Sequence, residues 1–172
     1  SSLNPSSISK LSKEVNDCGN FEVLYFADSL GNMEQNSVNK TVKAISKDWA
    51  GPLGIHTHDN KNEALSNSMT AIDNGVTYID ATILGMGRGA GNAKMEALLL
   101  ELAARGNNNY NAASILPLAI NDFGALKNKY KWGPNIYYFL SAIHNIHPTY
   151  IQEMSGDQRY DTDQILSAIN FL

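Results

Sequence analysis

The chain has 172 residues, 43% of them hydrophobic and 17% charged, which is typical of a soluble globular protein large enough to build a core. Its net charge of -4 and its lack of a basic block argue against binding to nucleic acid or to an anionic membrane. The single cysteine, Cys18, excludes an internal disulfide, and no apolar run could span a bilayer, so we expect a cytoplasmic protein.

Helical and strand patterns alternate along the first two thirds of the chain. The predicted elements, in chain order, are a helix at 4–17, a strand at 21–28, a helix to 49 that starts at Asn36 or Ser37, a strand at 52–58, a helix at 62–75, a strand at 76–83, a glycine-rich loop at 84–92 and a helix at 93–106. This alternation predicts an α/β fold with a parallel sheet. We assign residues 1–106 to it and residues 107–172, which have only helical patterns, to a helical C-terminal extension.

Two histidines, His56 and His58, stand two residues apart at the end of a predicted strand. Side chains two apart in a strand point to the same face, so both imidazoles should converge on one spot. Imidazole is a common metal ligand, and the pair therefore predicts a metal site, the alternative being a polar strand end. Mg²⁺ or Mn²⁺ would need added oxygen ligands, and catalytic Zn²⁺ would need a third protein ligand. Asp59 should alternate away from the pair.

Alternating glycines form the stretch GMGRGAGN at residues 85–92. The stretch satisfies a loose G-x-G-x-x-A dinucleotide pattern, but no later strand with an acidic end follows it. A tight loop whose backbone approaches a bound ion or substrate is the better interpretation. Arg88, the only charge in the loop, could meet a carboxylate or simply solvent.

Other polar residues also follow the predicted strands. The hydroxyl of Ser29 could bind a substrate carboxylate, or serve only the turn. Asp80 and Thr82 share a strand face, where Asp80 could orient a metal ligand. His144 and His147, in the helical part, are interpreted as structural or surface residues.

Three motifs together resemble one enzyme family: ADSLG at 27–31, HTHDN at 56–60 and GMGRGAGNAKME at 85–96. In order and spacing they are similar to those of the metal-dependent pyruvate aldolases and the related HMG-CoA lyase-like enzymes. The glycine loop is nearest to that of the 4-hydroxy-2-oxovalerate aldolases. The resemblance covers about residues 20 to 105.

The resemblance implies the C-terminal portion of a (β/α)₈ TIM barrel followed by an all-helical tail. It implies that His56, His58 and Asn92 bind Mn²⁺ or Mg²⁺ and that Ser29 contacts the carboxylate of a 2-oxo acid such as pyruvate. The implied reaction cleaves a 4-hydroxy-2-oxo acid to pyruvate and an aldehyde through a metal-bound enolate. The alternatives are an acyl-CoA condensing enzyme or lyase of the same superfamily, or a non-catalytic assembly module.

One family motif is absent from the sequence. The family's remaining metal ligand is an aspartate beside an arginine, and Arg88, Arg105 and Arg159 all lie elsewhere. A full barrel takes about 250 residues. We therefore expect the second half of an enzyme, inactive alone, with an incomplete metal site, apolar strand edges, and a catalytic base and arginine in the missing half. It would be a homo-oligomer, or pair with an aldehyde dehydrogenase or with the missing barrel half.

Overall fold

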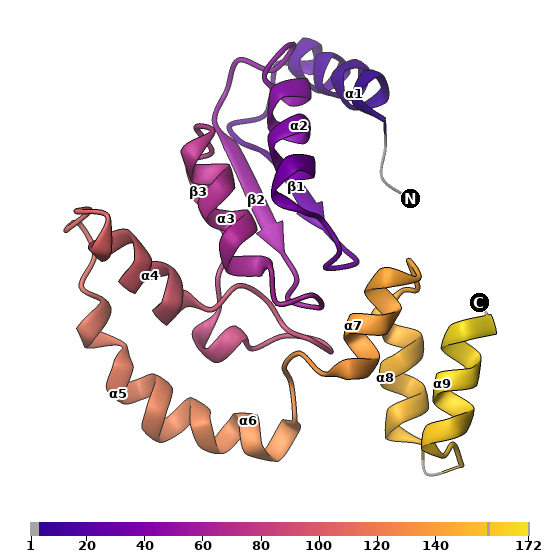
Figure 1. The fold of residues 1–172 in the computed structure, drawn as a ribbon. Helices are drawn as coiled ribbons and strands as arrows, with labels where there is room; N and C mark the ends of the chain where they lie inside the picture. The colour runs from indigo at the N-terminus through magenta and orange to yellow at the C-terminus, as the bar shows by residue number, and fades with distance from the viewer. Residues whose placement is uncertain (1–3, 158, 172) are drawn as a thin grey trace.

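A three-stranded parallel sheet forms the centre of the first part of the chain, in a computed structural model that describes residues 4–157 and 159–171. The strands lie in the order β1, β2, β3, and helices cover one face of the sheet (Figure 1). The elements are α1 (Pro5–Cys18), β1 (Leu24–Asp28), α2 (Gln35–Ile45), β2 (Leu53–Thr57), α3 (Ala64–Asp73), β3 (Tyr78–Ile79) and α4 (Met95–Ala104). The predicted alternation and the parallel sheet are confirmed.

Helix α1 begins and ends where the sequence predicts. The Asn4 side-chain oxygen accepts a hydrogen bond from the Ser7 N–H at 2.8 Å, and Pro5 fills the first helical position. Gly19 ends the helix with φ of 72°, a conformation that glycine adopts without steric cost. The local sequence is thus sufficient to fix both ends of this helix.

The start of α2 differs from the prediction of a cap at Asn36 or Ser37. The helix begins at Gln35, and no side chain caps it. Instead the carbonyl oxygen of Glu34 accepts the N–H groups of Ser37 and Val38 at 2.8 and 3.0 Å. The main chain therefore starts this helix without the polar side chain on which the prediction relied.

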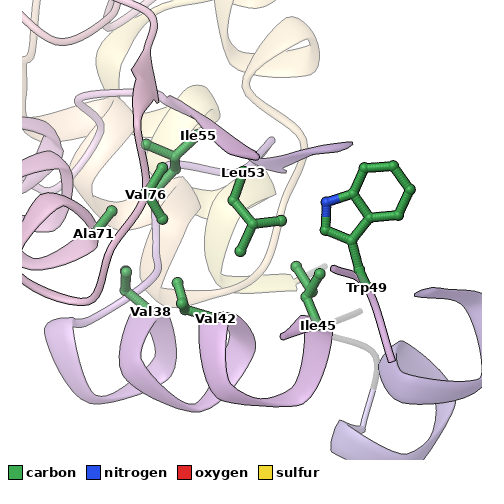
Figure 2. Close-up of a cluster of buried hydrophobic side chains, with 8 residues drawn as sticks. All are labelled: Val38, Val42, Ile45, Trp49, Leu53, Ile55, Ala71 and Val76. Atoms are coloured by element: carbon green, nitrogen blue, oxygen red, sulfur yellow. The ribbon is translucent and has the colours of Figure 1, made fainter. Parts of the chain in front are cut away.

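The main core lies between the sheet and helices α2 and α3. The register places Ile55 between Phe26 and Ile79, and all three side chains pack in this core. Trp49 lies beyond the end of α2, at one end of the core, and donates its Nε1–H to the Pro52 carbonyl at 3.0 Å. Figure 2 shows the buried members of the core: Val38, Val42, Ile45, Trp49, Leu53, Ile55, Ala71 and Val76.

The opposite face of the sheet is exposed and partly polar. Tyr25 and Tyr78 lie in register on either side of Gly54, and their ring centroids are 6.4 Å apart. A Cβ at Gly54 would collide with the Tyr25 ring, so the glycine makes room for it. His56 follows on the same face, nearer the carboxyl end of β2. In the described part of the chain, β1 and β3 pair only with β2, so each has one free edge.

Strand β3 is much shorter than the strand predicted at 76–83. Only Tyr78–Ile79 pair as a strand, and the Asp80 N–H adds one more bond to the Ile55 carbonyl at 3.0 Å. Beyond this point the backbone bonds to the returning chain instead, since the Thr82 N–H donates to the Ala93 carbonyl at 3.0 Å. The alternating pattern of the sequence continues to residue 83, but the main chain at Thr82 bonds to a segment outside the sheet.

The rest of the chain is helical in its described ranges. Figure 1 shows α7, α8 and α9 side by side, beyond the carboxyl ends of the strands. The buried Tyr138 of α7 packs with Ala90 of the glycine loop, so a second core joins the loop to these helices. The helices are α5 (Leu116–Leu118) and α6 (Gly124–Tyr130) with a π-helical turn between them, α7 (Ile136–Ile143), α8 (Pro148–Gly156) and α9 (Thr162–Phe171). The predicted boundary between 106 and 107 stays a prediction.

The aromatic residues of this part differ in burial. Trp132 and Tyr138 are buried, whereas Tyr137 and Phe139 are only partly so. Across residues 4–157 and 159–171, no helix has the length and apolar character needed to cross a bilayer.

Candidate metal centre

The turn after β1 is built around the buried carboxylate of Asp28. This carboxylate accepts the N–H groups of Asn32 and Met33 at 3.0 and 3.1 Å, which closes the turn. Gly31, with φ of 60°, packs so closely on the buried Asn60 side chain that a Cβ there would collide with it. Burial raises the pKa of Asp28, and the backbone hydrogen bonds oppose the shift. Ser29 lies exposed in this turn.

The two histidines after β2 lie together, as their spacing predicts. The ring centroids of His56 and His58 are 4.9 Å apart, and the rings are nearly perpendicular at 89°. Their Nδ1 atoms have different partners: His58 bonds the main-chain oxygen of Asp28 at 2.9 Å, and His56 bonds Oδ2 of Asp80 at 3.1 Å. A carbonyl or an ionised carboxylate only accepts, so both Nδ1 atoms donate. In the neutral form of each ring, Nε2 then keeps a free lone pair.

The surroundings of His58 favour its neutral form. Burial lowers the pKa of this imidazole, and the Arg88 guanidinium, together with His56 and His147 whenever they are protonated, lowers it further. The hydrogen bond to the Asp28 carbonyl opposes the shift. Neutral imidazole is the form that binds metals, so His58 could serve as a ligand.

The glycine loop folds on itself beside the histidines. The Asn92 N–H donates to the Gly85 carbonyl at 3.1 Å, and a Cβ at Gly91 would collide with that carbonyl oxygen. Gly85 and Gly91 also have positive φ angles, 68° and 80°. This self-contact accounts for these two glycines, while the nucleotide alternative stays untested.

Asn92 lies next to the histidine pair. It forms an isolated antiparallel bridge with His58, and its side-chain N–H donates to the Met86 carbonyl at 3.1 Å. Its Oδ1 is buried and has no hydrogen-bond partner among the residues that the structure describes. An unpaired buried amide oxygen is costly unless a ligand or water meets it, so this atom fits the place of a metal ligand.

Several polar residues near the site serve other contacts. Asp59 points elsewhere, as predicted: its carboxylate accepts the Ala64 N–H at 3.1 Å and lies 3.5 Å from Lys94 Nζ. The described partner of Arg88 is a hydroxyl and not a carboxylate: its guanidinium donates to Thr149 at 3.0 Å. No group of three or more His, Cys, Asp or Glu side chains is placed to hold a metal ion in the ranges that the structure describes.

The sequence reasoning missed two neighbours of the site. His147 lies near enough to His58 to act on its charge, although it also accepts the Thr149 N–H at 3.4 Å as the cap of α8. Tyr25 lies on the same sheet face as His56. The alternation of Tyr25 with Phe26 in β1 could have placed the tyrosine, whereas no local signal could have placed His147.

Comparison with protein families and curated sequences gives a consistent result. A family model described as HMGL-like matches residues 1–120. A 4-hydroxy-2-oxovalerate aldolase from Carboxydothermus hydrogenoformans is 38% identical over 49% of this chain and 25% of its own length. Another from Geobacillus genomosp. 3 is 36% identical over 60% of this chain and 31% of its length. An oxaloacetate decarboxylase from Mycobacterium tuberculosis is 31% identical over 60% and 30%. The chain thus spans less than a third of these relatives.

Solved structures show the same fold. The N-terminal domain of a Bacteroides vulgatus protein described as an aldolase superposes with a TM-score of 0.80 at 38% identity, over 94% of this chain and 52% of that one. The carboxyl transferase domain of Rhizobium etli pyruvate carboxylase gives a TM-score of 0.74 at 17% identity, over 91% and 26%. The second likeness concerns the fold alone.

Proposed function

Since the chain belongs to the HMGL-like family, we propose that it forms the metal-binding part of a carbon–carbon lyase that depends on Mn²⁺ or Mg²⁺. The proposed reaction cleaves a 4-hydroxy-2-oxo acid to pyruvate and an aldehyde. The relatives named 4-hydroxy-2-oxovalerate aldolase support this substrate class.

One observation carries the proposal: His56 and His58 are both anchored through Nδ1 and both leave Nε2 free. Their ring separation of 4.9 Å suits a shared ion. The unpaired Oδ1 of Asn92 adds an oxygen donor beside them. Oxygen ligands suit both Mn²⁺ and Mg²⁺, so either ion would need further oxygen ligands in addition to Asn92.

Each proposed residue has its own role. When bound, the ion would supply a Lewis acid for the oxygens of a 2-oxo acid. His56 and His58 would hold it through Nε2, and Asn92 through Oδ1. Ser29 directly follows Asp28, whose carbonyl anchors His58. The exposed hydroxyl of Ser29 would donate to the substrate carboxylate. The catalytic base and an arginine would come from outside this chain.

We also propose that this sheet belongs to a larger (β/α)₈ barrel. The short span of the chain on its relatives and the free edges of β1 and β3 support this proposal. The helices beyond residue 106 would then follow the barrel. Apolar side chains exposed along α5 and α6 would contact a second copy or a partner enzyme such as an aldehyde dehydrogenase: Leu118, Ile120, Leu126 and Tyr130.

A second candidate reaction is the decarboxylation of oxaloacetate. The relative from Mycobacterium tuberculosis that carries this name favours it. Both reactions would release the enolate of pyruvate, so the same ligands would serve either. A substrate panel separates them: a 4-hydroxy-2-oxo acid, oxaloacetate, and a 2-oxo acid with acetyl-CoA as the test for a condensing enzyme.

Calorimetric titration with Mn²⁺ tests the metal site. The unaltered chain should bind Mn²⁺, and His56→Ala should abolish binding. His144→Ala is the matched control, because His144 is exposed at the end of α7 and should leave binding unchanged. Equal Mn²⁺ binding by all three proteins would refute the ligand assignment.

Proton exchange tests the chemistry. Exchange of the pyruvate methyl protons in D₂O should be Mn²⁺-dependent in a protein that carries this chain together with its native upstream sequence. We expect no exchange with this chain alone, since the proposed base lies outside it. Lack of exchange in the longer protein would refute both proposed activities, the aldolase and the decarboxylase.

A further inference from the structure

The two imidazoles of the site are anchored by chemically different groups. His58 donates to a main-chain carbonyl, whereas His56 donates to the side-chain carboxylate of Asp80. A carboxylate is the stronger acceptor, since hydrogen bonds to charged groups are about twice as strong as those between neutral groups. The orientation of His56 therefore depends on one side chain that the proposed ligand set does not include.

The backbone holds Asp80 in place for this contact. Its N–H donates to the Ile55 carbonyl at 3.0 Å, directly before His56 in β2. This hydrogen bond fixes the main chain of Asp80 relative to His56, so its carboxylate lies within reach of the imidazole. Its Oδ2 lies 3.1 Å from Nδ1 of His56, although 48% of the Asp80 side chain is exposed.

Tyr25 lies on the sheet face that carries His56, in register with Gly54 of β2. Its ring covers Gly54 on the face that carries His56, and a Cβ at residue 54 would displace it. Burial raises the pKa of the Tyr25 phenol, and the nearby charge of Asp80 raises it further. The side chain with a hydrogen bond to this carboxylate is His56, at 3.1 Å.

We propose that Asp80 is a positioning residue that holds His56 in its Nδ1–H tautomer and directs its Nε2 into the metal site. Its effect on metal binding rests on the function proposed above, but its effect on the tautomer does not. Partners of this kind behind a metal-binding histidine are typically worth about 10–100-fold in metal affinity.

The variant Asp80→Asn tests the proposal, because the amide keeps the shape of the side chain but can also donate to Nδ1. We expect the Kd for Mn²⁺ to rise about 10–100-fold. The matched control is Asp73→Asn, which removes an exposed carboxylate that pairs with Arg105 away from the site and should not change the Kd.

Nitrogen-15 NMR of the metal-free chain gives a readout that a merely structural role would not move. His56 should be protonated on Nδ1 in the unaltered protein and shift toward the Nε2–H form in Asp80→Asn. Should the unaltered chain bind no Mn²⁺, the proposed function fails while the tautomer measurement still decides the role of Asp80. His56 protonated on Nε2 in the unaltered protein, or an unchanged tautomer and an unchanged Kd in the variant, would overturn the proposal.

Discussion

Replacing Gly91 by alanine tests whether the glycine loop is held by its own close contact. Gly91 has φ of 80°, and a Cβ there would collide with the Gly85 carbonyl oxygen. Gly75 has a similar φ of 89°, but a Cβ there would meet no atom within 4 Å. The two positions therefore share the backbone strain and differ only in the collision, which makes Gly75→Ala the matched control.

The expected magnitudes separate the two variants. An alanine in the left-handed region costs about 1–2 kcal/mol, which is the whole effect expected for Gly75→Ala. Overpacking adds about 1–3 kcal/mol, so we expect Gly91→Ala to lose about 2–5 kcal/mol in total. For a chain of this size each kcal/mol lowers Tm by about 2–4 °C.

Urea unfolding followed by circular dichroism gives the free energies of both variants. Gly91→Ala should also weaken Mn²⁺ binding, because the collision displaces the neighbouring Asn92, whereas Gly75→Ala should not. Two free energies of unfolding that agree within about 0.5 kcal/mol, below the overpacking cost, would refute the idea that the loop is closed by this contact.

Three further changes have expected outcomes in the same unfolding assay. Because the pKa of His58 is lowered in the folded state, its contribution to the free energy of unfolding is complete above about pH 6.5 and is lost as the pH falls through the folded-state pKa. His58→Ala should therefore make the free energy of unfolding depend less on pH in this range. An unaltered pH dependence would contradict the lowered pKa. Ile55→Val should cost about 0.5–1.5 kcal/mol, because Ile55 is fully buried, and no loss would mean that the core relaxes around the gap. Trp132→Phe should cost about 1–2 kcal/mol, since its Nε1–H donates to the Leu84 carbonyl at 3.0 Å, and a neutral result would show that water replaces the bond.

Local signals were enough to predict much of the fold. The helix start at Asn4 and the glycine at residue 19 follow from rules that involve only adjacent residues. The two-residue spacing of His56 and His58 likewise brought their rings together, because β2 is a regular strand up to Thr57. Where neighbours along the chain decide the geometry, the sequence is sufficient.

Contacts between distant residues decide the rest. Strand β3 stops early because the Thr82 main chain bonds to the returning loop, which no strand pattern reveals. Arg88 meets Thr149, and Asn32 donates to Asn145 at 2.8 Å, across 61 and 113 residues of sequence. Such pairs depend on how the helices pack over the loop, and the sequence alone gave no means to choose them.

The two anchors of the histidine pair differ in how mutation can reach them. Every residue type at position 28 has a carbonyl oxygen, so no substitution deletes the acceptor of His58, although a change there can distort the turn. The acceptor of His56 is a side chain, and one codon change at Asp80 removes it. A single substitution at position 80 can therefore release one imidazole while the main chain still holds the other.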